Sequence, residues 1–177
     1  MDRPVEQLVD EILVMDCQSG RVKALEILVS RWQKRLWRYA YRLVGDTEAA
    51  WDITQESWLG IIKGLKKLQD PANFKAWAYR ITTNKSIDWL RKSKSAKQVS
   101  IEEIKDAPYK ENKDTGVKEL MAKLDVRKQV VLSLYYFEQL SIHEINMALK
   151  IPKGTVKSRL ANARKELKEL WQKYIEE

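Results

Sequence analysis

The 177-residue chain carries 33 Lys and Arg against 25 Asp and Glu, and its formal net charge at pH 7 is +8. Its one cysteine, Cys17, excludes an intramolecular disulfide, and with one histidine, His143, the chain lacks the ligands of an ordinary zinc site. The acidic N-terminus has no secretory apolar segment and no apolar run reaches the about 20 residues that span a bilayer, so we expect a soluble, cytoplasmic protein without cofactor or metal.

Apolar residues at helical spacing predict three helices in the first half of the chain. The first covers residues 22–43. Gly45 suits a position just after its C-terminus and Asp46 suits the N-cap of a second helix, which reaches about residue 68. Pro71 ends that helix and suits the first turn of a third, which continues to about residue 90.

The middle of the chain differs from both of its ends. Residues 93–115 are polar, mixed in charge and poor in large apolar side chains, which is typical of a flexible linker. Helical spacing returns at Val117 and continues to the end. We therefore predict an all-α protein with two small helical domains, residues 1–92 and residues 116–177, joined by the linker.

A helix-turn-helix is predicted in the second domain. Ser141 and Glu144 form a capping-box pattern that starts one helix, and Pro152 stops the turn before a second helix. In such a motif the second helix enters the major groove of DNA. Its apolar face is Val156, Leu160, Ala163 and Leu167, and the candidate DNA-contacting residues off that face are Lys153, Thr155, Lys157, Ser158, Arg159 and Asn162. The alternative is a solvated basic helix at the end of a bundle.

Two segments of the first domain also suggest binding surfaces. Residues 46–56 hold four acidic side chains and no basic one. The third helix mixes aromatic, amide and basic side chains, a combination that suits single-stranded nucleic acid, because bases stack on rings and phosphates pair with cations. The alternative for Phe74 and Trp77 is that both are core residues.

These stretches together resemble one family. Residues 24–92 are similar to region two, and residues 140–167 to region four, of the extracytoplasmic-function sigma factors, the small class of bacterial RNA polymerase initiation subunits. The two regions occur in the family's order with a linker between them. The sequence departs from the family pattern at four positions. Asn146 stands where alanine is usual, and Lys150 replaces a usual glycine. Asn162 stands where a basic residue is common, and Ala161 where a larger side chain is common.

The resemblance implies a role for each segment. The second helix would dock on the clamp helices of core RNA polymerase, through Asp52, Gln55, Glu56 and Trp58. Residues 68–73 would form the loop that captures a flipped base of the minus-ten element, and the third helix would melt and read that element. The implied minus-ten residues are Asp70, Asn73, Phe74, Lys75, Trp77, Arg80, Asn84, Lys85, Asp88 and Arg91. The helix-turn-helix would read the minus-thirty-five element as duplex.

Other function classes fit the sequence less well. His143 and Glu144 begin like a zincin helix but lack the second histidine, and no phosphate-binding glycine loop occurs, so we expect no enzyme activity. A dimeric helix-turn-helix regulator of duplex DNA is the alternative, although it has no need of the aromatic third helix. The resemblance also implies an anti-sigma factor as a partner.

Overall fold

The computed structural model describes residues 5–97 and 115–176, and every regular element in those ranges is helical, which confirms the predicted all-α class. No helix in them is long and apolar enough to cross a membrane. The elements in chain order are α1 (Val5–Gln18), α2 (Val22–Val44), α3 (Thr47–Gly64), the 3-10 turns η1 (Leu65–Lys67) and η2 (Pro71–Asn73), α4 (Phe74–Lys97), α5 (Thr115–Ala122), α6 (Val126–Leu132), the π turn η3 (Ser133–Phe137), α7 (Ile142–Leu149) and α8 (Lys153–Glu176).

Helices α1 to α4 pack around a cluster of aromatic side chains. The Trp32 ring of α2 is 1% exposed and meets Phe74 and Tyr79 of α4 edge-on, with centroids 5.3 and 5.8 Å apart. The ring centroids of Tyr39 and Tyr79 lie 5.1 Å apart, and the Tyr39 hydroxyl oxygen is 2.6 Å from Thr83 Oγ1. Edge-to-face pairs stabilise the packing beyond what the buried area of the rings provides, so the cluster fixes α4 against α2.

The predicted junction between the first two helices is confirmed. Gly45 has φ 73°, in the left-handed region, and its N–H donates to the Tyr41 carbonyl at 2.8 Å. The Asp46 side chain accepts from the Ala49 N–H at 2.7 Å and caps α3. One turn thus closes α2 and opens α3 in the antiparallel direction.

Helix α1 was not predicted from the sequence. It packs along α2 and beside both 3-10 turns, and Asp10 pairs with Arg31 of α2 at 2.9 Å. The Gln18 amide donates to the carbonyls of Leu65 and Leu68, at 3.0 and 2.8 Å. Through these bonds α1 supports the loop that precedes α4.

The predicted linker overlaps the end of α4. This helix continues to Lys97, so residues 93–97 are helical, and the remaining linker prediction up to residue 114 lies outside the described residues. Helices α5, α6 and α7 then pack around α8. Leu134, Ile145 and Val156 are each 0% exposed in the centre of this second group.

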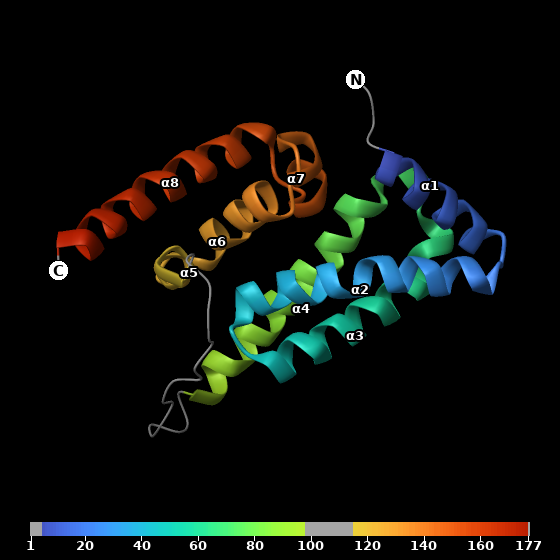
Figure 1. The fold of residues 1–177 in the computed structure, drawn as a ribbon, viewed down its shortest axis with the longest axis horizontal. Coiled ribbons are helices and arrows are strands. Elements are labelled where there is room, and N and C mark those ends of the chain that lie inside the picture. Colours follow the sequence, from blue (N-terminus) through green and yellow to red (C-terminus); the bar gives the residue numbers. More distant parts are fainter. Residues whose placement is uncertain (1–4, 98–114, 177) are drawn as a thin grey trace.

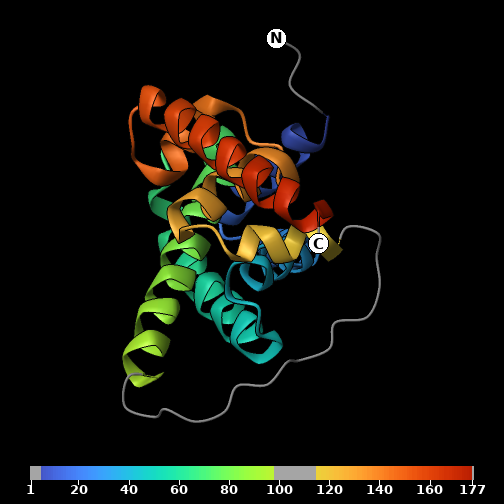
Figure 2. The same cartoon turned by 90° about the vertical axis from the view of Figure 1, so that its left-hand side faces the viewer.

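The two groups of helices are in contact. Figures 1 and 2 show α5–α8 gathered on one side of the α1–α4 bundle. Helix α7 packs against α4 and α6 against α2, and the buried apolar residues of both groups join one continuous cluster. The contact therefore includes core-like packing as well as polar groups.

The α3–α4 contact depends on two glycines. A Cβ on Gly64 would lie 2.7 Å from the Trp77 ring, and one on Gly60 would lie 3.3 Å from Ile81. We expect Gly64→Ala to lower the free energy of unfolding by ~1–3 kcal/mol, because the added methyl overpacks this contact. Urea unfolding followed by circular dichroism measures the change.

The matched control is Gly154→Ala on α8, where a Cβ would have no neighbour within 4 Å. Replacing a helical glycine there should raise the free energy of unfolding by up to ~1 kcal/mol. Equal stability of the two variants would contradict the close α3–α4 approach.

Candidate nucleic-acid and protein interfaces

The predicted helix-turn-helix is formed by α7 and α8. Both hydrogen bonds of the capping box are present: the Ser141 N–H donates to the Glu144 carboxylate at 2.8 Å, and the Glu144 N–H donates to Ser141 Oγ at 3.2 Å. Lys150 ends α7 with φ 53°, in the left-handed region where glycine is usual. The Asn146 amide donates to the Ile151 carbonyl at 2.6 Å, so the two unusual residues shape the turn together.

The six candidate residues of the helix-turn-helix gather at the start of α8. Val156, Leu160 and Ala163 are at most 2% exposed and hold the helix on its domain. The opposite side faces solvent. Lys153, Lys157, Ser158 and Asn162 are exposed there, and Thr155 and Arg159 are half-buried at its edges. This solvent-facing start of α8 has the hydrogen-bond donors and cations that duplex DNA requires.

Helix α4 presents a second polar face. Trp77, Arg80, Asn84, Asp88 and Arg91 recur at spacings of three and four residues, so they share one side of the helix, and none of them is buried. Tyr79, on another side of the helix, packs against α2. This arrangement joins an aromatic ring, an amide and two guanidinium groups along one accessible strip, which we call the α4 face.

A pocket of about 510 Å³ opens at the N-terminal end of the α4 face. Asp70 shapes its rim by accepting from the Ala72 N–H at 3.0 Å and from the Asn73 amide at 3.4 Å. Its lining residues are Gly64, Lys67, Leu68, Gln69, Asp70, Asn73, Ala76, Trp77, Arg80 and Met147. The structure thus brings together four of the predicted minus-ten residues, Asp70, Asn73, Trp77 and Arg80, around one hollow.

Three other predicted minus-ten residues lie elsewhere. Phe74 is 1% exposed in the aromatic core, which favours the core interpretation of this ring. Lys85 pairs with Glu56 of α3 at 3.1 Å. Lys75 donates to the Gln139 carbonyl at 3.2 Å, across the contact with the C-terminal helices. None of the three belongs to the α4 face.

The outer side of α3 combines acidic and apolar groups. Asp52, Gln55 and Glu56 are exposed, as a protein-binding role requires, whereas Trp58 is only 7% exposed and packs in the core. Leu59 and Ile62 continue the exposed side, with 58% and 45% of their surface accessible. We call Asp52, Gln55, Glu56, Leu59 and Ile62 the α3 face. Sequence reasoning did not predict its two apolar members, although Leu59 follows Gln55 by four residues and Ile62 follows Leu59 by three.

Two buried tyrosines beneath these interfaces have perturbed phenols. Within residues 5–97 and 115–176 no group of three His, Cys, Asp or Glu side chains could hold a metal ion. Burial raises the pKa of the Tyr39 and Tyr79 phenols well above the ordinary value, and the neighbouring Glu138 carboxylate raises it further. Both phenols therefore stay protonated and act as neutral hydrogen-bond donors.

Solved structures share this fold. CnrH, in a complex with the cytosolic domain of CnrY, matches with a TM-score of 0.74 and 25% identity over 93% of this chain and 97% of that one. The sigma factor RpoE, in a complex with the anti-sigma factor NepR from Bartonella quintana, matches with a TM-score of 0.71 and 23% identity over 85% of this chain and 98% of that one. At 23% identity, the likeness to RpoE shows a shared fold.

Sequence comparisons identify both helical groups. Residues 28–96 match the family model for Sigma-70 region 2, and residues 120–169 match that for Sigma-70, region 4. The ECF RNA polymerase sigma factor SigW of Bacillus subtilis (strain 168) is 27% identical over 88% of this chain and 92% of its own length. The RNA polymerase sigma factor SigV of the same strain is 31% identical over 73% of this chain and 80% of its own length. The chain belongs to the extracytoplasmic-function family of RNA polymerase sigma factors.

Proposed function

We propose that this alternative sigma factor divides promoter recognition and polymerase binding among the start of α8, the α4 face and the α3 face. A sigma factor is not an enzyme: it binds core RNA polymerase and directs it to a promoter. The observation that carries the residue assignment is the α4 face with its pocket, because an aromatic, amide and cationic strip beside a hollow that can admit a base suits melted DNA.

The minus-thirty-five element is read by the start of α8. The second helix of a helix-turn-helix places its first residues against base edges in the major groove. Thr155, Ser158 and Asn162 carry uncharged hydrogen-bonding side chains, of which Thr155 is half-buried at the edge of the exposed side, and Lys157 and Arg159 are cations. We assign base contacts to the first three and phosphate contacts to the two cations.

The minus-ten element is read as a single strand by the α4 face. Extruding a base costs a few kcal/mol, which a fitted pocket and phosphate contacts must offset. Asp70, Asn73 and Trp77 line the pocket that receives the base, while Arg80 and Arg91 lie along the path of the backbone. Asn84 and Asp88, between the two arginines, offer hydrogen-bonding groups to further bases.

The α3 face docks on core polymerase. Its acidic residues complement a basic partner, and Leu59 and Ile62 supply the apolar centre that a stable interface needs. Because the fold is shared with CnrH, solved with the cytosolic domain of CnrY, and with the sigma factor RpoE, solved with the anti-sigma factor NepR, we also assign this chain an anti-sigma partner. Its place of action is the cytoplasm, where polymerase and promoter are found.

The duplex assignment predicts a salt-dependent effect. The double variant Lys157→Ala with Arg159→Ala should weaken binding of holoenzyme to a promoter carrying the minus-thirty-five element. Removing two phosphate contacts should also reduce the slope of log affinity against log salt concentration by about 2. Fluorescence anisotropy over a salt series measures both quantities.

Lys168→Ala with Lys173→Ala, at the other end of α8, is the matched control, since it removes the same charge from the same helix. If the control and the test variant lose affinity equally, general electrostatics explains the effect and the assignment to the start of α8 is wrong.

The α3 assignment predicts loss of polymerase binding. Asp52→Lys with Glu56→Lys should abolish co-elution with core RNA polymerase, because the change reverses the charge of the docking face. The helical circular dichroism spectrum should be retained, since both side chains are exposed. Gel filtration of each variant mixed with core enzyme provides the measurement.

Glu119→Lys with Glu169→Lys makes the same change of net charge on exposed sites of α5 and α8. This control should still co-elute with polymerase. Co-elution of the α3 variant at the same level as the control would mean that the α3 face serves another purpose.

A further inference from the structure

Four arginines form a stripe along α2. Arg31, Arg35, Arg38 and Arg42 recur at spacings of four, three and four residues, so they share one side of the helix, which we call the α2 stripe. Like charges at these spacings repel each other, and nearby anions relieve the repulsion. Three of the four arginines have a carboxylate partner on a neighbouring element: the pairs are Arg31–Asp10 at 2.9 Å, Arg35–Glu6 at 3.2 Å and Arg42–Glu138 at 2.7 Å.

Arg38 is the exception in the α2 stripe. Its side chain is exposed, and it forms no hydrogen bond or ion pair with any residue in the ranges 5–97 and 115–176. Its neighbours in the stripe pair with carboxylates on two different elements, Glu6 on α1 and Glu138 after η3. Between these two pairs, the stripe therefore has a guanidinium without a carboxylate partner among the described residues.

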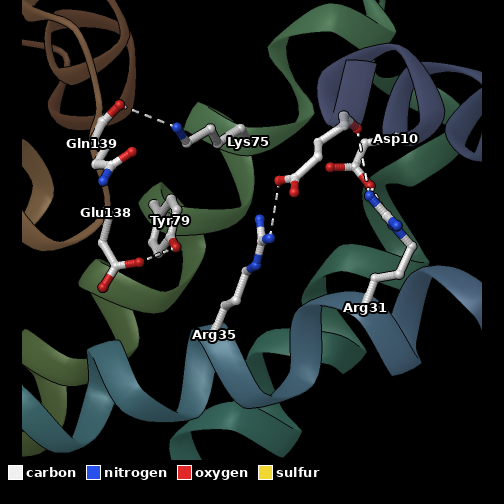
Figure 3. Close-up of polar contacts among 8 residues, drawn as sticks. Asp10, Arg31, Arg35, Lys75, Tyr79, Glu138 and Gln139 are labelled. Carbon is white, nitrogen blue, oxygen red and sulfur yellow. Dashed lines mark hydrogen bonds and ion pairs between the residues drawn. The ribbon is translucent and has the colours of Figure 1, made fainter. Parts of the chain in front are cut away.

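A cavity of about 470 Å³ lies beside the α2 stripe. Helices α1, α2 and α4 and the turns η2 and η3 all contribute to its lining. Figure 3 shows part of this lining, with the Arg35 and Lys75 side chains between the Tyr79–Glu138 contact and Asp10. A cavity of this volume has room for a small molecule and not only for a single ion.

The cavity has two cations in excess. Each carboxylate in its lining is paired with an arginine of the α2 stripe. Two cations of the lining remain, Arg38 and Lys75. The Lys75 ammonium donates to the Gln139 carbonyl at 3.2 Å, an acceptor without formal charge. A ligand with two negative charges would balance both cations, and an arginine fork with a lysine point charge is a combination that suits phosphates.

The same cavity offers a surface to a flat ring. Phe137 lines it and is 38% exposed, and the Arg42 guanidinium lies over this ring, 4.1 Å from its centroid. Pro71 adds an apolar contact from η2, and the Gln7 amide has hydrogen-bonding capacity beyond its 3.4 Å bond to the Ala72 carbonyl. Nucleobases stack on aromatic and guanidinium planes and hydrogen-bond through their edges. Two phosphates joined to a base therefore match both parts of the lining.

We propose that this cavity binds a free nucleoside diphosphate, whose phosphates contact Arg38 and Lys75 and whose base packs against Phe137. The site is separate from the start of α8, the α4 face and the α3 face, none of which includes Arg38, so the inference goes beyond the proposed function. Phe137 belongs to region 4 and Arg38 to region 2, so the bound nucleotide contacts both helical groups. It therefore raises the free energy of unfolding once its concentration exceeds its dissociation constant.

Isothermal titration calorimetry of the full chain tests the site with ADP, GDP, CDP and UDP. The buffer contains no magnesium, so that no metal ion competes with the protein for the phosphates. We expect at least one of the four to bind. The matching nucleoside and inorganic pyrophosphate, which each lack one half of the ligand, should bind about ten-fold more weakly or worse. Binding of none of the four would overturn the site, and equal affinity for pyrophosphate would overturn the assignment of a nucleotide.

Arg38→Ala is the test variant and Lys34→Ala is its matched control. Both remove one exposed positive charge from α2, but Lys34 does not line the cavity. Arg38→Ala should weaken nucleotide binding about ten-fold, as expected for the loss of a charge-assisted hydrogen bond. Lys34→Ala should keep the wild-type affinity. Equal losses in the two variants would mean that net charge alone attracts the nucleotide, and the site would be wrong.

Promoter binding separates this site from the DNA-binding surfaces. Arg38→Ala should leave the affinity of holoenzyme for a promoter unchanged, whereas Lys157→Ala with Arg159→Ala should weaken it without changing nucleotide binding. If Arg38→Ala weakens promoter binding and no nucleotide binds the wild-type chain, Arg38 contacts a DNA phosphate and the proposal fails. Nucleotide binding that depends on Arg38 would support the cavity site even if the assignment at the start of α8 is wrong.

Discussion

The rotation of α4 about its own axis is the constraint on which both DNA-facing features depend. The edge-to-face contacts of Trp32 with Phe74 and Tyr79 bury one side of this helix. Because an α-helix repeats every 3.6 residues, burying that side turns Trp77 and Arg80 to the pocket and the rest of the α4 face to the surface. The same contacts place Tyr79 where its hydroxyl reaches Glu138.

Much of the fold follows from local signals in the sequence. Gly45 and Asp46 each have a physical role that predicts where one helix ends and the next begins, and Ser141 opens α7 as its spacing from Glu144 predicts. Helix α1 was not predicted because its solvent-facing side is also apolar, with side chains such as Val5, Leu8 and Ile12 exposed, so its apolar residues do not mark a single buried face.

The candidate sites were predictable to different degrees. Polar positions on the start of α8 and on α4 follow from periodicity, whereas the burial of Phe74 and Trp58 depends on which partner helix packs against each ring. The contacts of Glu138 with Arg42 and Tyr79 join residues far apart in the chain, and no local pattern indicates them. The α3 face stays exposed while the two helical groups are in contact.

Transcription in a purified system shows whether this chain directs polymerase to a promoter. Core RNA polymerase would be incubated with the wild-type protein and a library of promoter fragments, and the transcripts would be sequenced. We expect transcripts only when the protein is added, from fragments that share two separated elements, of which the one nearer the start site is melted. If transcription does not depend on the protein, and the protein alone binds a palindromic duplex tightly, the chain is a dimeric helix-turn-helix regulator instead.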